Sequence, residues 1–162
     1  MATVRTAEVQ WIGGFNDGEG TIVKTTTGVL PELEVSWPAR VDIESTKTSP
    51  EELLAAAHAA CFAMQFTHGL VGAGADPQEM HVSAKVSFEP GVGITESALT
   101  ARVTVNGLTD EKIVEVAERA KLGCPISRAL AGIEITLELP DLAPPPEEAE
   151  GEPAVQGAGG EL

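Results

Sequence analysis

The sequence predicts an α+β fold, in which three strands precede a long helix and further strands surround a second helix. Three observations support this prediction. Apolar and polar residues alternate in several short segments, as strands require. Residues 50–71 form a capped apolar helix, and residues 110–122 form a second, amphipathic helix that ends near Gly123. The expected order is strand, strand, strand, helix, strand, strand, helix, strand.

The first three strands are predicted by their alternation and by the turn between the first two. Residues 3–11 alternate, and the cluster Asn16-Asp17-Gly18 is typical of a hairpin turn. Residues 21–26 form the returning strand, and residues 33–37 form the third strand. Because Pro38 interrupts this pattern, Arg40 is expected just ahead of the long helix.

The start of the long helix has the clearest local signal in the chain. Ser49 suits the N-cap, Pro50 the first helical position and Glu52 the third, so the three residues form a capping box. The helix body is rich in Ala and Leu and is expected to run to about Val71. Apolar residues on nearly all of its sides predict a helix that is buried on most of its surface. Its alanines would let another helix approach closely.

The second half of the body contains two alternating segments, residues 80–90 and 98–108. We expect them to form an antiparallel pair joined near Gly91–Gly93. After the second helix, Gly123 stands where a C′ glycine is expected, and residues 132–139 form the last strand. These elements complete a single domain over residues 1–140.

The acidic balance of the chain excludes some partners. The formal net charge is −15, and residues 141–162 contain acidic residues but no basic ones. Their Pro, Gly and Glu content predicts a disordered tail outside the domain. The remaining body is still acidic, so no basic patch is expected to neutralise the phosphates of nucleic acid or of an anionic membrane.

The apolar helix is not expected to cross a membrane, because His58, Gln65 and His68 interrupt it and the apolar run is short. The N-terminal residues alternate and do not form the continuous apolar block of a signal peptide. We therefore expect a cytoplasmic protein.

The two cysteines, Cys61 and Cys124, are candidates for chemistry. They are too few for a disulfide scaffold, which leaves two unrelated buried thiols or a redox pair. Cys61 lies within the long helix, and Cys124 lies between Gly123 and Pro125 at the exit of the second helix. Such a pair suits a two-step reaction, in which one cysteine is oxidised to sulfenic acid and the other condenses with it to a disulfide.

A reactive Cys61 needs a nearby cation to stabilise its thiolate, and Arg40 is the best chemical candidate. The alternative for Arg40 is a solvated charge at the end of a strand. Glu51 lies about 80° around the helix from Cys61 and about 15 Å away along its axis, whereas Glu52 points to the opposite face. Glu51 could therefore pair with Arg40 or lie near the cysteine of a second subunit. Its alternative role is to favour the positive end of the helix dipole.

His58 shares a helix face with Cys61, which raises the question of a metal site. A metal would need further ligands, and His68 and His81 are isolated in the sequence. A protease-like Cys–His pair would need an orienting acid at a suitable spacing, which the sequence does not offer. We therefore predict neither a metal site nor a protease-like pair.

Several motifs resemble the OsmC/Ohr family of osmotically inducible and organic-hydroperoxide-resistance proteins. They are "TSPEELLAAAHAACFAM" around Cys61, "AKLGCPISRAL" around Cys124, "GIEITLEL" after it, and "GEGT" and "GVL" earlier, so the resemblance covers residues 11–139. The resemblance implies an OsmC-like fold of antiparallel sheets with two main helices. It also implies an intertwined homodimer with its central helices at the two-fold axis and each active site at the subunit interface.

The resemblance further implies a cysteine-based peroxidase without metal, haem or other cofactor. By position, Cys61 would be the peroxidatic cysteine and Cys124 the resolving one. Arg40 would match the arginine that the OsmC branch places before the helix, and Glu51 the glutamate that orients it. The Ohr branch takes its arginine from the N-terminal glycine-rich loop, which here, as "FNDGEGTI", contains none. The chain is therefore more similar to the OsmC branch.

The resemblance implies the reduction of organic hydroperoxides, with hydrogen peroxide as a further candidate substrate, in oxidative or osmotic stress defence. Cys61 and Cys124 would close a disulfide, which a lipoyl protein or another dithiol system would then reduce. Apolar candidates around Cys61, namely Leu54, Ala57 and Phe62, would favour an organic substrate. The alternative is a non-enzymatic member of the family, either a redox sensor or a binder of small ligands.

Overall fold

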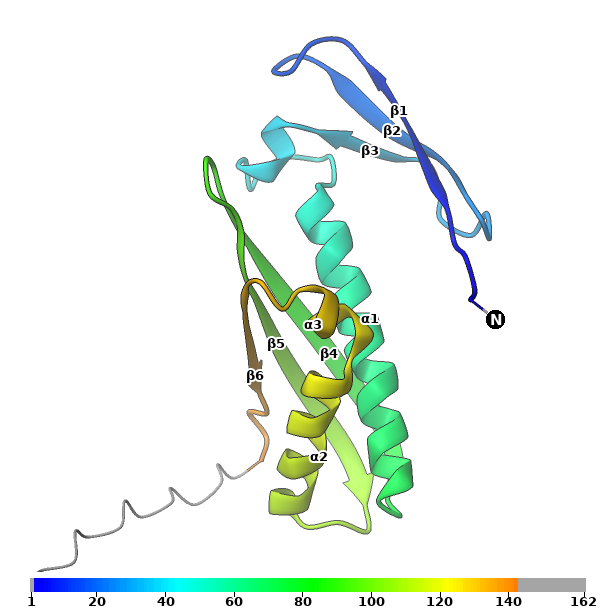
Figure 1. Ribbon diagram of the computed structural model, residues 1–162, viewed down its shortest axis with the longest axis vertical. Coiled ribbons are helices and arrows are strands. Elements are labelled where there is room, and N and C mark those ends of the chain that lie inside the picture. The colour runs from blue at the N-terminus through cyan, green and yellow to red at the C-terminus, as the bar shows by residue number, and fades with distance from the viewer. Residues whose placement is uncertain (1, 143–162) are drawn as a thin grey trace, which may run out of the picture.

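The computed structural model describes residues 2–142, which form two three-stranded sheets: one beyond the start of a long helix, and one along the side of that helix (Figure 1). The mixed α+β class and the predicted order of strands and main helices are confirmed, and two short helices, η1 and α3, are added. The elements are β1 (Ala7–Ile12), β2 (Glu19–Thr25), β3 (Leu33–Ser36), η1 (Pro38–Arg40), α1 (Pro50–Gly72), β4 (Asp76–Glu89), β5 (Gly93–Asn106), α2 (Asp110–Gly123), α3 (Pro125–Ala129) and β6 (Glu134–Glu138).

The N-terminal sheet has the order β1-β2-β3, with both pairs antiparallel. The predicted hairpin is confirmed, since Ile12 pairs with Glu19 across the turn. Gly20 is required by packing: a Cβ there would lie 2.6 Å from Val35 and 2.8 Å from the indole of Trp11. This close approach gives a physical reason for the glycine of the "GEGT" motif.

Helix α1 begins as the sequence predicts. The hydroxyl of Ser49 accepts a hydrogen bond from the amide of Glu52 at 3.2 Å, and Pro50 is the first helical residue. With 23 residues, α1 is long and apolar enough to cross a membrane by length and composition, so the expectation that it is too short was wrong. The helix packs against β4 and α2, however, and its aromatic residues form the core of the body.

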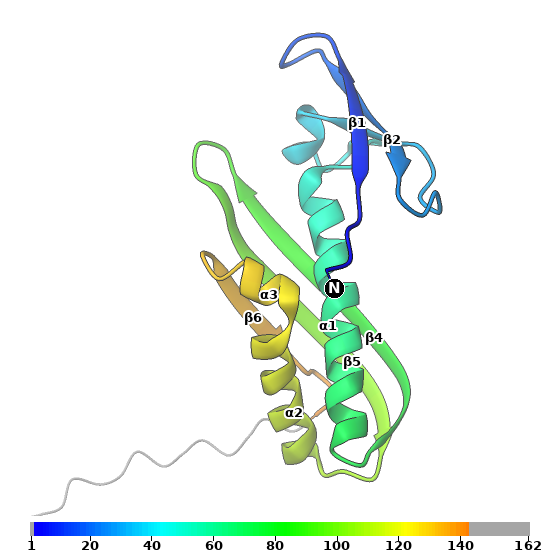
Figure 2. The ribbon, with the colours of Figure 1, turned by 45° about the vertical axis from the view of Figure 1, so that its right-hand side comes forward.

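The second sheet has the order β4-β5-β6. Strands β4 and β5 form a long antiparallel hairpin, and β6 returns parallel to β5 after α2 and α3. The expectation of purely antiparallel sheets was therefore wrong for this sheet, because the two helices between β5 and β6 form a crossover that allows parallel pairing. Both hairpin strands begin earlier than predicted, because Asp76 pairs with Asn106 and Gly93 with Glu89 in segments that lack clean alternation. Helices α1 and α2 lie side by side over the sheet (Figures 1 and 2). The fully buried core side chains include Phe62, Phe66, Leu70, Leu99 and Cys124.

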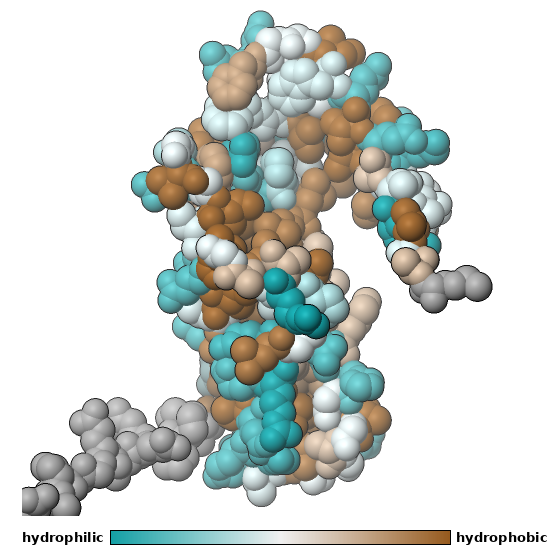
Figure 3. All heavy atoms as spheres, in the orientation of Figure 1, coloured by the Kyte–Doolittle hydropathy of each residue, from teal (hydrophilic) through white to brown (hydrophobic). Residues whose placement is uncertain are grey.

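The N-terminal sheet is not covered in the same way. It stands beyond the start of α1, away from the second sheet (Figure 2). Every residue of β1 is exposed. Ten of the fourteen large hydrophobic side chains that are exposed in residues 2–142 lie between Val4 and Ile43. Hydrophobic surface is visible on this sheet and on the region beneath it (Figure 3).

The body continues slightly beyond its predicted end at Pro140. Asp141 forms an ion pair with Arg102 at 2.5 Å, and Leu142 packs against the core. The rest of the predicted tail, residues 143–162, lies outside the described residues.

Candidate active site

The fold brings Cys61 and Cys124 together. Cys61 lies in the middle of α1, and Cys124 lies between the end of α2 and the start of α3, fully buried. The two thiols are near neighbours, since each shifts the pKa of the other, and both cysteines are free. The backbone of Cys124 is extended (φ −62°, ψ 123°) and Pro125 starts α3, so the chain turns here and Cys124 can reach α1.

Gly123 has a different role from the predicted one. It is the last residue of α2 and not a left-handed C′ residue, because its φ is not positive. A Cβ at this position would lie 3.3 Å from the side-chain amide of Gln65 on α1. The glycine therefore lets α1 and α2 approach closely beside Cys124.

The two thiols are in different environments. Burial raises the pKa of Cys61, against a hydrogen bond from the backbone amide of Ile126. Burial also raises the pKa of Cys124, but hydrogen bonds with Ser127 and with Cys61 outweigh burial and lower it overall. None of the groups that shift the pKa of Cys61 within residues 2–142 is a cation. Within one chain, therefore, the pKa of Cys61 is not lowered by a positive charge.

Arg40 and Glu51 form a second pair. The Nε of Arg40 donates to Glu51 Oε1 and Oε2 at 3.0 and 3.2 Å, and its Nη2 donates to Oε1 at 2.5 Å. The guanidinium also lies 3.9 Å from the ring centre of Phe88 and 4.9 Å from that of Trp37. Burial raises the pKa of Glu51, but the hydrogen bonds with Arg40 outweigh it, so the carboxyl remains ionised. Arg40 is thus fixed by a carboxylate and by two aromatic rings.

The four predicted site residues therefore form two pairs, Cys61 with Cys124 and Arg40 with Glu51. The pairing of Arg40 with Glu51 is one of the two arrangements that the sequence left open. Because Glu51 lies at the start of α1 and Cys61 ten residues later, the pairs are about 15 Å apart along the helix. The expected contact of Arg40 with the sulfur of Cys61 is not made within one chain.

The sequence did not predict the role of His58, which forms a buried hydrogen-bond network. Its Nδ1 lies 2.7 Å from the hydroxyl oxygen of Ser97 on β5, and its Nε2 lies 2.8 Å from that of Ser127 on α3. All three side chains are buried, and burial lowers the pKa of His58, so its imidazole is neutral. The serines are 39 and 69 residues away in sequence, so no local pattern could reveal them. Within residues 2–142, no group of three or more His, Cys, Asp or Glu residues could hold a metal ion.

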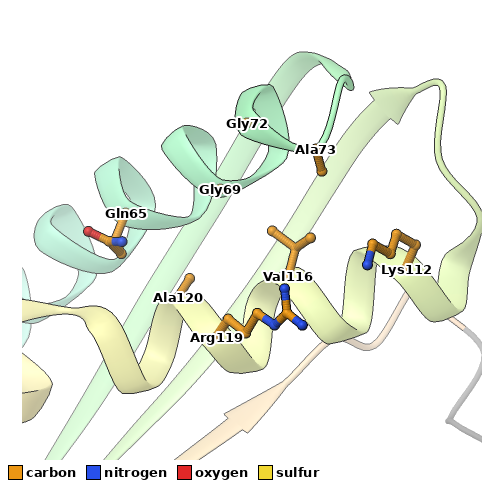
Figure 4. A pocket seen from close by; sticks show the side chains of 8 residues that line it. All are labelled: Gln65, Gly69, Gly72, Ala73, Lys112, Val116, Arg119 and Ala120. Atoms are coloured by element: carbon orange, nitrogen blue, oxygen red, sulfur yellow. The ribbon is translucent and has the colours of Figure 1, made fainter.

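Two hollows are relevant to ligand binding. One, of about 170 Å³, adjoins Arg40 and is mainly apolar; it is lined by Trp11, Phe15, Val35, Ser36, Trp37, Arg40 and Pro50. The other, of about 290 Å³, lies between α1 and α2, with Lys112 and Arg119 on its rim (Figure 4). Both of these cations pair with Glu115 at 2.5 to 2.6 Å, so one carboxylate compensates half of their charge.

Comparison with known proteins identifies the class of protein. The family model of the OsmC-like proteins matches residues 43–138. Peroxiredoxin OsmC of Escherichia coli is 37% identical over 141 residues, which cover 85% of this chain and 96% of the relative. The organic hydroperoxide resistance protein OhrB of Bacillus subtilis is 28% identical over 129 residues, which cover 75% of this chain and 90% of the relative.

The structure is also similar to solved structures of organic hydroperoxide resistance proteins. A crystal structure of an organic hydroperoxide resistance protein from Elizabethkingia anophelis superposes with a TM-score of 0.64 at 33% identity, and the match covers 86% of this chain and 98% of that one. The chain therefore belongs to the family of OsmC-like proteins.

Proposed function

We propose that this chain is a thiol-dependent peroxidase that reduces organic hydroperoxides in stress defence. The observation that carries the proposal is the meeting of Cys61 with Cys124, two cysteines that are 63 positions apart in sequence. The names of the relatives, peroxiredoxin OsmC and organic hydroperoxide resistance protein, support the same activity. We expect the protein to act in the cytoplasm, where dithiol systems are available to regenerate it.

The reaction starts at Cys61. Its thiolate attacks the outer oxygen of the hydroperoxide, the O–O bond breaks, and the alkoxide takes up a proton and leaves as an alcohol. Cys61 is then a sulfenic acid, which the thiolate of Cys124 attacks. An S–S bond forms, the S–O bond breaks, and the hydroxide leaves as water after gaining a proton. An external dithiol, such as a lipoyl protein, reduces the disulfide to two thiols and is itself oxidised.

Activation of Cys61 requires a cation, and we propose that a second copy of the chain supplies it in a homodimer. Two features support this association. The N-terminal sheet leaves its hydrophobic side chains uncovered, and α1 has an exposed face of small residues that includes Ala56, Ala57 and Ala60. If two α1 helices pack antiparallel, the start of one helix lies near the middle of the other. Arg40 of the partner subunit would then lower the pKa of Cys61 and donate to the leaving oxygen.

The hollow beside Arg40 supports an organic substrate. Its lining combines one guanidinium with apolar and aromatic side chains, including Phe15 and Trp37. Such a lining can hold an alkyl or aryl group while the guanidinium faces the peroxide oxygens. Hydrogen peroxide has no group to fill the hollow, so we expect it to be the poorer substrate.

The experiment that tests the function follows peroxide consumption with cumene hydroperoxide and a lipoylated protein or dithiothreitol as reductant. We expect Cys61→Ser to lose all thiol-dependent turnover. We expect Cys124→Ser to form the Cys61 sulfenic acid, which dimedone traps, and then to over-oxidise to sulfinic acid. Turnover by Cys61→Ser would contradict the proposal. Oxidation of the wild type for a single cycle, with no regeneration by any dithiol, would favour a redox sensor instead.

A further inference from the structure

The buried network around His58 is not used by the reaction described so far. Its three members come from different elements, with His58 on α1, Ser97 on β5 and Ser127 on α3. The exposed fraction is 0% for His58 and Ser97 and 6% for Ser127. A fully buried histidine that hydrogen-bonds through both ring nitrogens is held in one orientation.

The network reaches the resolving cysteine. Ser127 lies three residues after Cys124, in the first turn of α3, and is one of the groups that lower the pKa of Cys124. The same hydroxyl oxygen lies 2.8 Å from Nε2 of His58. Ser127 therefore stands between an imidazole nitrogen and a thiol, at hydrogen-bond distance from the imidazole.

The second step of the proposed reaction has a proton requirement that this arrangement can meet. Cys124 must lose its proton before it attacks the Cys61 sulfenic acid, because the thiolate is the nucleophile. The departing hydroxide must gain a proton to leave as water. Cys124 is fully buried, so bulk water is poorly placed to perform either transfer.

We propose that His58, acting through Ser127, takes the proton of the resolving cysteine Cys124. This inference rests on the proposed peroxidase function and concerns its second step only. His58 touches no reacting atom, and so it is a positioning residue for Ser127 as well as the end of a short proton relay. The relay uses the tautomer in which Nδ1 donates to Ser97 and Nε2 accepts from Ser127.

The second step moves one proton along the relay, forms one S–S bond and breaks one S–O bond. The Cys124 proton passes to Ser127 Oγ as the Ser127 proton passes to His58 Nε2. The Cys124 sulfur then forms the S–S bond, and the S–O bond of the sulfenic acid breaks with both electrons leaving on the oxygen. The hydroxide takes the proton from His58 through Ser127 and leaves as water, which restores neutral His58. No oxidant is consumed beyond the hydroperoxide that formed the sulfenic acid.

The electrostatics of the site are consistent with this relay. Burial lowers the pKa of His58, and no charged group contributes to that shift, so the imidazole is in its accepting form at neutral pH. The hydrogen bonds with Ser127 lower the pKa of Cys124. The groups that bond to His58 are Ser97 and Ser127, and Cys61 lies one turn further along the same helix.

The test separates the two chemical steps in single-turnover experiments with cumene hydroperoxide. Samples are quenched with dimedone or with an alkylating agent, and mass spectrometry counts thiol, sulfenic acid, sulfinic acid and disulfide. His58→Gln keeps an acceptor near Ser127 but cannot carry the proton. Ser127→Ala removes the relay, and Ser127→Thr restores its hydroxyl. His68→Gln replaces an exposed histidine of the same helix and serves as the matched control.

We expect sulfenic acid formation to stay within about twofold of wild type in all four variants. Disulfide formation should slow about 100-fold in His58→Gln and Ser127→Ala, and stay within a few-fold of wild type in Ser127→Thr and His68→Gln. The pH profile adds a readout that a purely structural role would not change. In His58→Gln the rate of disulfide formation should rise with pH, in step with the thiolate fraction of Cys124, whereas the wild-type rate should change less.

Two results would overturn the inference. One is a wild-type rate and pH profile of disulfide formation in both His58→Gln and Ser127→Ala. The other is an equal slowing of both steps, which would mean that the network only supports the fold. If wild-type protein forms no sulfenic acid at Cys61, the proposed function itself fails, and this inference fails with it.

Discussion

The N-terminal sheet and the body of the chain differ in how they bury hydrophobic side chains. In the body, α1 and α2 cover the second sheet and enclose Phe62, Phe66 and Leu99. Among the strands of the N-terminal sheet, all within the described residues, Ile22 is the one large hydrophobic residue that is buried, and Trp11, Ile12 and nearby Phe15 are exposed. The body is thus complete in one chain, while the sheet lacks a covering surface.

The same division separates the predicted site residues. The two cysteines belong to the body, where the fold of one chain brings them together. Arg40 lies next to the N-terminal sheet and contacts Glu51 at the very start of α1. The redox pair therefore depends on the body alone, and under the proposed function its activation depends on the surface that a second copy would cover.

The tight packing of the body, in contrast to the N-terminal sheet, is tested most strongly by a substitution that leaves a cavity in its core. Phe62→Ala should lower the free energy of unfolding by about 3–5 kcal/mol, because a fully buried ring is lost from a packed core. Chemical denaturation followed by circular dichroism measures this. Val92→Ala, at the exposed turn between β4 and β5, is the control and should change stability by less than about 0.5 kcal/mol. Similar losses in both variants would mean that the body is not tightly packed.

Removal of the Arg40 guanidinium tests the part of the site that lies next to the N-terminal sheet. Arg40→Ala should lower kcat/KM for cumene hydroperoxide about 10²- to 10³-fold, because a donor to the leaving oxygen is lost. Arg40→Lys keeps the charge but not the two-pronged contact with Glu51, so it should recover only part of the activity. The control is Arg102→Ala, which breaks the exposed pair with Asp141. Wild-type kinetics in Arg40→Ala would remove Arg40 from the mechanism.

A charge on the uncovered sheet tests the association itself. Ile12→Asp places a carboxylate on a side chain that is 68% exposed in the single chain. If a second copy covers this surface, the dissociation constant of the dimer should rise at least about tenfold, as analytical ultracentrifugation would measure. Activity should then fall on dilution and recover at high protein concentration. Leu122→Asp, on an exposed position of α2, is the control, and equal behaviour of the two variants would argue against the sheet as the interface.

The smallest expected effect is a pH dependence of the free energy of unfolding that comes from His58, a residue of the body. The pKa of His58 is lowered by burial from an ordinary value of 6.5, so the folded state binds its proton less readily than the unfolded state. Its contribution to stability is complete above pH 6.5 and is lost as the pH falls through the folded-state pKa, at about 1.4 kcal/mol for each unit of difference. His58→Gln should remove this slope between pH 6.5 and 5, and His68→Gln should keep it. A slope that persists in His58→Gln would assign it to another group.

Much of the fold could be predicted because its signals are local. The N-cap at Ser49, the hairpin turn at Asn16-Asp17-Gly18 and the helix between Thr109 and Gly123 depend on neighbouring residues. The early start of β4 at Asp76 could not be predicted, because it is stabilised by pairing with Asn106, which is distant in sequence.

Prediction of the site was likewise successful for local patterns and unsuccessful for contacts between distant segments. Cys61 and Cys124 were recognisable from motif and spacing, and helix geometry placed Glu51, not Glu52, on the side of Cys61. The partners of His58 were hidden, since Ser97 and Ser127 come from other elements. That Gly123 is the last residue of α2, with the side chain of Gln65 beside it, could not be predicted either, because Gln65 belongs to another helix.

The stacking of Trp37 has an optical consequence. The chain contains two tryptophans, Trp11 and Trp37, and the Arg40 guanidinium lies 4.9 Å from the ring centre of Trp37. Phe15 lies on the same indole, with ring centres 4.4 Å apart. Emission from Trp37 is therefore sensitive to the position of the cation, and a Trp11→Phe protein would isolate that signal. The molecule thus contains its own fluorophore for following Arg40 in real time as a hydroperoxide binds.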